Sequence, residues 1–221
     1  MCFSATASFG VSAALLAGGI VSAKHVKTSS QIPFAMIPFV FSVQQFCEGF
    51  IWLSFKNTAL ESAGVGFTYA FLVFAQVVWP TLVPYAIYKM EGRNGRKKNL
   101  RLLLITGIAL SIYLAFSLLY YPAKSSISNF HIRYDLSRPD QYMYITAVLY
   151  VIATIVPPFI SSIKRMSAIG LFNLSSFIVT VLFFSEYLIS IWCFFAAAIS
   201  IGVFLVLKKT ALVDNYKPSM L

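Results

Sequence analysis

The chain has 221 residues, of which 59% are hydrophobic and 11% are charged, and its mean hydropathy is +0.80. A soluble domain usually contains about 45–50% apolar residues, so this composition excludes an ordinary soluble protein. The formal net charge of +10 does not indicate nucleic-acid binding, because no basic helix, aromatic–basic motif or zinc knuckle accompanies it.

Seven apolar segments follow one another along the chain, each long enough to cross a bilayer at about 20 residues per span. They cover residues 4–22, 33–55, 66–88, 102–121, 141–163, 168–185 and 187–207. We therefore predict an all-α integral membrane protein. Its single domain, residues 1–221, would be one bundle of seven transmembrane helices with a long outer loop at residues 122–140.

The first segment has small residues at every fourth position, at Gly10, Ala14, Gly18 and Ser22. In lipid this spacing lets a neighbouring helix approach closely, so we expect the segment to pack inside the bundle. It lacks the positive n-region of a signal peptide, and we interpret it as a true span. In the third segment, Trp79-Pro80 and Pro84 are expected to bend the helix.

The Lys and Arg residues are distributed unevenly between the connections. Thirteen of the 17 lie after the first, third and fifth segments or in the C-terminal tail, and four lie in the other connections. The positive-inside rule therefore predicts an outside N-terminus and a cytoplasmic C-terminus. We interpret the densest group, between Lys89 and Arg101, as a topology determinant that touches anionic headgroups.

The second segment carries a carboxylate, Glu48, in the middle of an apolar run. Ionisable side chains inside a span are costly and usually face a protein interior or a wet cavity. Gln44, Glu48 and Trp52 share one helix face, because residues four apart stack on each other. Glu48 could equally be a structural carboxyl that holds helices together through hydrogen bonds.

The depth of each residue in the membrane can be estimated from the helical rise of about 1.5 Å per residue. This estimate places Gln76 at the same depth as Gln44, and it places the other unusual polar residues in the outer half of the bundle. We therefore predict an outward-facing polar pocket there, covered by the 122–140 loop, which an Arg133–Asp135 pair would order. The candidate ligand-binding residues are Glu48, Gln44, Gln76, Trp52, Tyr69, Trp192 and His131.

The three cysteines, Cys2, Cys47 and Cys193, have no CxxC spacing. Free cysteines usually behave as small buried hydrophobic residues. Two alternatives remain open: a disulfide that joins Cys193 to Cys2 or to Cys47, and a metal site at the outer level. The candidate metal ligands are Cys2, His131, Glu48 and Cys193.

Several stretches also resemble a known family. They are residues 1–9 (MCFSATASF), residues 45–52, Trp79-Pro80, residues 131–134 and residues 190–197. They are similar to a family of small bacterial integral membrane proteins that begin Met-Cys-Phe-Ser and are known only as uncharacterised seven-span proteins. The resemblance implies a bacterial cytoplasmic (inner) membrane and no particular activity.

Three kinds of function remain open. The protein could bind or transport a small molecule or lipid through the outer pocket. It could instead be a membrane-embedded enzyme acting on an outer-leaflet substrate, with Glu48 or Glu186 as general acid or base and His131 with a cysteine as metal ligands or nucleophile pair. It could also be a non-catalytic subunit of a membrane complex. The sequence identifies the lipid bilayer as a partner and assigns no catalytic residue and no cofactor.

Overall fold

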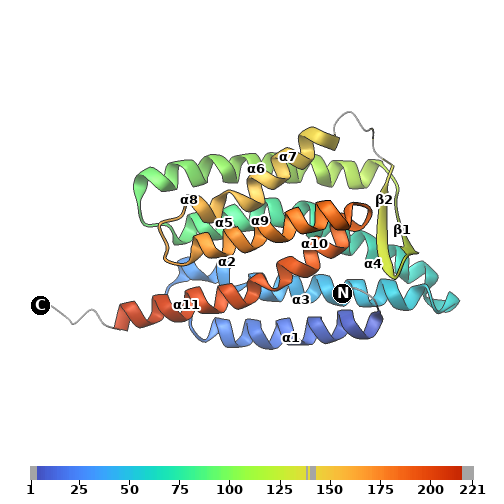
Figure 1. Cartoon of the computed structure of the whole chain (residues 1–221), viewed down its shortest axis with the longest axis horizontal. Coiled ribbons are helices and arrows are strands. Elements are labelled where there is room, and N and C mark those ends of the chain that lie inside the picture. Colours follow the sequence, from blue (N-terminus) through green and yellow to red (C-terminus); the bar gives the residue numbers. More distant parts are fainter. Residues whose placement is uncertain (1–3, 138, 140–142, 216–221) are drawn as a thin grey trace, which may run out of the picture.

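The structure is a computed structural model that describes residues 4–137, 139 and 143–215. Within these residues seven helices are long and apolar enough to cross a membrane, which confirms the predicted number. They run side by side along one direction, and a β-hairpin crosses one end of the bundle (Figure 1). We call this the hairpin end, and the opposite end, where Glu91 lies, the Glu91 end.

Three of the seven spans are uninterrupted helices: α1 (Ala5–Ala23), α6 (Asn94–Tyr120) and α9 (Met166–Phe183). The second span comprises η1 (Ser29–Gln31), α2 (Ile32–Ala35) and α3 (Ile37–Ser54). The third comprises η2 (Thr58–Leu60), α4 (Glu61–Leu72), η3 (Val73–Val78) and α5 (Trp79–Met90). The fifth comprises α7 (Met143–Ile155) and α8 (Pro157–Ile160), and the seventh comprises η5 (Ser185–Tyr187), α10 (Leu188–Ala197) and α11 (Ile199–Asn215).

Prolines account for most of these interruptions, because proline has no N–H to donate to the preceding turn. Pro33, Pro38, Pro80 and Pro157 each lie within the first two residues of the helix that follows a break. Where Trp79-Pro80 was expected to bend the third span, a six-residue π-helix, η3, ends and α5 begins.

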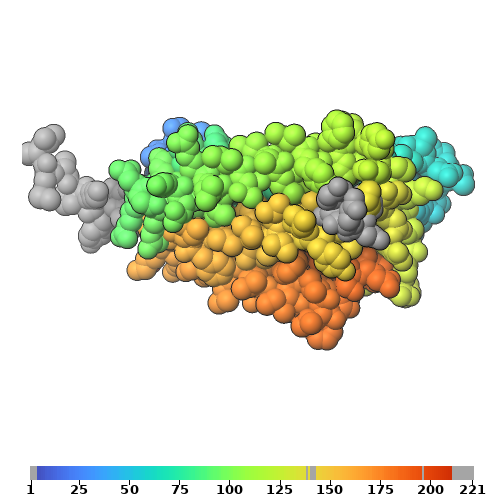
Figure 2. All heavy atoms as spheres, turned by 90° about the horizontal axis from the view of Figure 1, so that it is seen from above, coloured from blue at the N-terminus to red at the C-terminus, as the bar shows by residue number. Residues whose placement is uncertain are grey.

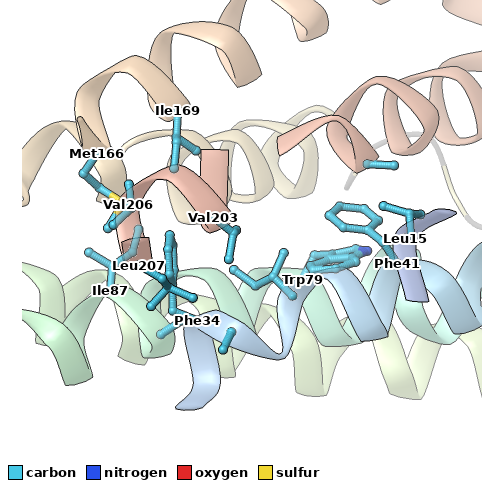
Figure 3. Packing of buried hydrophobic residues seen from close by; sticks show 14 of the residues in the cluster. Leu15, Phe34, Phe41, Trp79, Ile87, Met166, Ile169, Val203, Val206 and Leu207 are labelled. Carbon is cyan, nitrogen blue, oxygen red and sulfur yellow. The ribbon is translucent and has the colours of Figure 1, made fainter. Parts of the chain in front are cut away.

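Two clusters of buried apolar residues form the core. One lies toward the Glu91 end, where Phe34, Ile87, Met166, Val203 and Leu207 pack together (Figure 3). The other lies toward the hairpin end and contains both Cys47 and Cys193. The two clusters together extend from one end of the bundle toward the other.

Helix α1 packs on α3 through a different face from the one predicted. Ser12 and Ser42 exchange hydrogen bonds from each hydroxyl to the other's backbone carbonyl, both at 2.8 Å. Gly10 and Ala14 are exposed, and a Cβ added at Gly10 or Gly18 would meet nothing within 4 Å. The first three ladder positions are therefore open, whereas the fourth, Ser22, is buried together with Ser8 and Ser12 on the packed face.

The segment predicted as an outer loop is an antiparallel β-hairpin, β1 (Ala123–Ser128) and β2 (His131–Leu136). Its two-residue turn has Asn129 at φ 47° and Phe130 at φ 63°, the left-handed pair that a type I′ hairpin turn requires. In β2, buried Ile132 and Tyr134 alternate with exposed Arg133 and Asp135. The predicted Arg133–Asp135 pair is present at 2.8 Å.

The outer surface of the bundle is apolar over α6, α7 and α9, which are adjacent on the face shown in Figure 2. On α6, Ile112, Phe116 and Leu119 lie on one stripe and are 66%, 69% and 87% exposed. Such a surface would aggregate in water but matches the hydrocarbon core of a bilayer. The helical bundle is that of a multi-pass membrane protein.

Candidate functional site

The π-helix η3 places non-regular backbone in the middle of the third span. A π-helix leaves carbonyl groups outside the normal helical pattern, and such segments are frequent at functional sites. The hydroxyl of Tyr150 donates a hydrogen bond to the carbonyl of Ala75, and Ser111 Oγ donates to the carbonyl of Val77 at 2.7 Å. Neighbouring helices therefore satisfy the carbonyls that this irregular backbone turns away from its own helix.

Two cavities lie beside this segment, inside the bundle. The larger, of about 140 Å³, lies toward the hairpin end and has Ala75 and Gln76 in its wall. The smaller, of about 60 Å³, lies toward the Glu91 end and is lined mainly by apolar residues such as Phe34 and Phe41. Tyr150, Trp192 and Cys193 line both cavities, so these three side chains lie between them. We call the pair the central cavities.

The α3 face that carries Glu48 forms the layer behind the cavities. Trp79 donates its Nε1 hydrogen to Gln44 Oε1 at 2.8 Å, and Gln44 also lies beside the Cys193 thiol. Ser190 Oγ donates to Glu48 Oε1 at 2.6 Å, and Glu48 has no exposed surface. Polar groups on α3 are thus held against α10, and they fix the position of the α10 residues that line the cavities.

Trp192 is fixed by a second chain of hydrogen bonds. Its Nε1 donates to Asn173 Oδ1 at 3.1 Å, and Asn173 Nδ2 donates to the backbone carbonyl of Thr154 at 3.3 Å. Its ring meets Tyr150 edge-on, with 5.6 Å between centroids, and lies 4.8 Å from the ring of Phe177. These contacts form an aromatic wall with few exposed polar atoms. Such a wall suits an apolar molecule that carries a small polar group.

The predicted ligand-binding residues fall into three groups. Gln76 and Trp192 line the central cavities. Gln44 and Glu48 lie in the layer behind, and neither is among the lining residues. The remaining three, Trp52, Tyr69 and His131, belong to the hairpin end.

Two of these three residues hold the hairpin in place. The Tyr69 hydroxyl accepts a hydrogen bond from the backbone N–H of Ala123 at 3.1 Å. The His131 ring lies 4.8 Å from that of Tyr187, and burial lowers the pKa of His131 below its ordinary value. The central cavities are therefore deeper in the bundle, and more apolar, than the pocket the sequence indicates.

Cys47 and Cys193 are both free, buried thiols, so the alternative of a Cys47–Cys193 disulfide is not realised in this structure. Cys2 lies outside the described residues, and with it the Cys2–Cys193 alternative. Among the residues that are described, no three or more His, Cys, Asp or Glu side chains gather as a metal site would require. The predicted metal site, which includes Cys2, stays a prediction.

Glu91 is a buried acidic residue that the sequence analysis did not single out. It is 2% exposed and follows the last turn of α5. Its carboxylate accepts hydrogen bonds from the backbone N–H of Arg93 at 2.9 Å, the backbone N–H of Ser162 at 2.7 Å, and the hydroxyls of Ser161 and Ser162. Arg96 donates to the carbonyl of Ser161 at 2.7 Å. We call these contacts the Glu91 network.

The Glu91 network ties the α5–α6 connection to the α8–α9 connection. Burial acts to raise the pKa of Glu91, but the hydrogen bonds from Ser162, Arg93 and Ser161 outweigh it and hold the pKa below its ordinary value. One signal was available in the sequence: Glu91 is the sole acidic residue between Lys89 and Arg101. An acid among so many basic residues indicates a specific partner.

Comparison with known proteins gives one match. No curated protein and no solved structure matches the chain. A family model matches residues 1–217, nearly the whole chain, and this agrees with the resemblance to an uncharacterised family. The chain belongs to a family of unknown function, DUF6629.

Proposed function

We propose that this protein binds a small, mainly apolar molecule in the central cavities and passes it across a bacterial cytoplasmic membrane. The observation that carries the proposal is the position of these cavities between the hairpin end and the Glu91 end. The hairpin packs over one end, and the Glu91 network joins two connections at the other. Each end is closed by contacts between separate elements, so one can open while the other stays closed.

The size of the cavities limits the ligand. A dry cavity of about 150 Å³ with apolar walls holds a molecule the size of benzene. The larger central cavity has about this volume, and the smaller one lies on the other side of Tyr150 and Trp192. The side-chain amide of Gln76 offers polar recognition to a single hydroxyl or N–H group. We therefore expect a neutral ring-sized molecule with one such group.

The irregular third span supports the transport part of the proposal. Transporters commonly place broken helices at the bilayer midplane, where the unwound backbone meets the substrate. Here η3 supplies Ala75 and Gln76 to the wall of the larger cavity. In the proposed orientation the hairpin end faces outward and the Glu91 end faces the cytoplasm, as the distribution of Lys and Arg favours.

Binding can be tested on purified protein in a non-ionic detergent, with indole as the probe and thermal unfolding as the readout. Indole should raise the midpoint temperature, because a ligand that binds only the native state stabilises it. Ala75→Leu fills the larger cavity. It should raise at least about tenfold the indole concentration that gives the same increase in midpoint temperature. Ala63→Leu adds the same atoms at an exposed position of α4 and should leave the response unchanged.

A charged analogue, indole-3-acetate, should bind far more weakly than indole, since an unpaired carboxylate is costly to bury. If both leucine variants respond to indole like the wild type, indole binds elsewhere and the proposed site is wrong.

Opening can be followed through Cys193, which lines both cavities and is buried. In a Cys2→Ser, Cys47→Ala background, N-ethylmaleimide should label Cys193 slowly, and indole should slow the labelling further. Glu91→Gln removes charge-assisted hydrogen bonds from one closed end and should speed the labelling several-fold. Labelling that responds to neither indole nor Glu91→Gln would contradict passage through these cavities.

A further inference from the structure

A groove on the outside of the bundle lies between α1 and the seventh span, away from the central cavities. It encloses about 480 Å³ and is lined on one side by Val11, Ala14, Gly18 and Val21 of α1. The other side is lined by residues of the seventh span: Phe194, Phe195, Ala198, Ser200, Ile201 and Phe204. The groove exists because Ala14 and Gly18 of α1 are small residues and no side chain fills the space beside Gly18.

One buried polar atom lies in the wall of this apolar groove. Ser200 is 8% exposed, and its Oγ has no hydrogen-bond partner among the described residues. A buried hydroxyl without a hydrogen-bond partner in an apolar wall is less stable than a hydrogen-bonded one. It therefore marks a place where a ligand that carries a hydrogen-bond acceptor gains energy.

Positive charge gathers where the groove approaches the Glu91 end. Lys208 Nζ lies 5.7 Å from the centre of the Phe204 ring, and the His25 ring meets Phe204 edge-on at 5.3 Å. The adjacent Lys209 lies near Lys164 and Arg165. Neither of the two ion pairs found among the described residues involves these basic groups, because both pairs involve Arg133 at the hairpin end.

The polar groups follow one another in the order of the groups in a phospholipid. Ser200, Phe204 and Lys208 lie four residues apart and share one helix face. The Lys208 ammonium lies over the ring of Phe204, and Phe204 is about one helical turn from Ser200. In a glycerophospholipid, one glycerol backbone separates the phosphate from the first ester carbonyl. The phosphate at Lys208 would place that carbonyl near Ser200.

We propose that this groove binds one anionic glycerophospholipid, with an acyl chain between α1 and the seventh span, the ester carbonyl on Ser200 and the phosphate beside Lys208 and His25. The groove is wide enough for an acyl chain because Gly18 and Ala14 leave its floor open. Basic pockets between transmembrane helices are recognised binding places for anionic headgroups. This site does not depend on the function proposed for the central cavities.

The test measures retained lipid by native mass spectrometry after the purified protein is mixed with phosphatidylglycerol or phosphatidylcholine of the same acyl chains. Wild type should retain one phosphatidylglycerol in preference to phosphatidylcholine. Gly18→Leu fills the groove and should reduce retained phosphatidylglycerol at least tenfold. Gly10→Leu is the matched control: it also adds a leucine to an open position of α1, but outside the groove, and should retain the lipid.

Two further variants separate the parts of the lipid. Lys208→Gln should abolish the preference for phosphatidylglycerol while leaving phosphatidylcholine binding unchanged, and Ser200→Ala should weaken both lipids several-fold. Thermal unfolding in detergent without added lipid checks that each variant folds. Equal retention of lipid by the Gly18→Leu and Gly10→Leu proteins would overturn the proposal. A wild-type dimer that only Gly18→Leu disrupts would overturn it too, and would assign the groove to a second copy of the chain.

Discussion

At the scale of single residues, the buried polar groups inside the seven spans differ in how they are satisfied. Glu48 and Gln44 each accept a hydrogen bond from a neighbouring helix, from Ser190 and Trp79 respectively. Gln45 has no exposed surface, and neither of its side-chain polar atoms has a partner among the described residues. A carboxylate in an apolar run marks a helix face that is buried against other helices, but its partner on α10 depends on tertiary packing.

Glu91→Gln should destabilise the protein, because Gln keeps the size of the side chain but loses its charge. Hydrogen bonds to charged groups contribute about 1.5–3 kcal/mol each, and Glu91 accepts several. We expect a loss of about 2 kcal/mol in the free energy of unfolding, measured by thermal unfolding in detergent. Glu61→Gln, at an exposed position on α4, is the matched control and should change little.

The same group predicts a pH dependence. The pKa of Glu91 is lowered in the folded protein, so its contribution is fully present above the unfolded pKa of about 4.3. It is lost as the pH falls through the folded pKa. Wild type should therefore lose stability more steeply than Glu91→Gln below about pH 4.5. Parallel curves for the two proteins would show that Glu91 is not held as a carboxylate.

His131 predicts a second pH effect, at the hairpin. Burial lowers its pKa, so between the folded pKa and the unfolded value of about 6.5 the unfolded chain binds more protons. The hairpin should therefore lose stability as the pH falls from 7.5 to 5. The loss would be measured as faster amide hydrogen exchange in β2, after correction for the intrinsic effect of pH on the exchange rate. His131→Phe keeps a ring against Tyr187 and should remove this change. An unaltered pH response in His131→Phe would contradict the assignment.

At the scale of elements, long apolar segments were predicted well and irregular ones were not. The helices follow from composition, because a span must satisfy its backbone internally. The hairpin was missed although HIRYDL alternates apolar and polar residues, because its turn places Phe130 at a positive φ, which glycine usually supplies. The π-helix depends on Tyr150 and Ser111 from other helices, so no local pattern reveals it.

Close packing of α6 on α5 can be tested at Gly107. A Cβ at this position would lie 1.9 Å from the carbonyl oxygen of Pro80, a backbone atom that cannot rotate away. Gly107→Ala should therefore destabilise the protein by about 1–3 kcal/mol, as overpacking does. Gly66→Ala on α4, where an added Cβ meets nothing within 4 Å, should be neutral or slightly stabilising. Equal unfolding temperatures for the two variants would mean that α5 and α6 lie farther apart in the protein than in this structure.

At the scale of the whole molecule, a cover formed by residues 122–140 was expected from the sequence, whereas the Glu91 network at the opposite end was not. Depth counting placed Gln76 level with Gln44, and Trp79, three residues after Gln76, does bond Gln44. It also predicts a polar pocket in the outer half of the bundle, and this pocket stays a prediction. Two of the residues expected to line it, Tyr69 and His131, take part in contacts between the hairpin and the bundle. The cavities arise where Tyr150 and Trp192 leave space, and such space depends on side-chain packing.

The orientation of the bundle gives the last prediction. If the distribution of Lys and Arg sets the topology, the first turn of α4 faces outward and the first turn of α6 faces the cytoplasm. Ser62→Cys and Asn94→Cys place thiols at these exposed, uncharged positions, in a Cys2→Ser background. Native Cys47 and Cys193 are buried and should react slowly.

On intact cells an impermeant maleimide should label Ser62→Cys and leave Asn94→Cys unlabelled, and inverted vesicles should give the opposite pattern. The reverse result would exchange the two faces, and would place the Glu91 network and the proposed lipid site on the outer side.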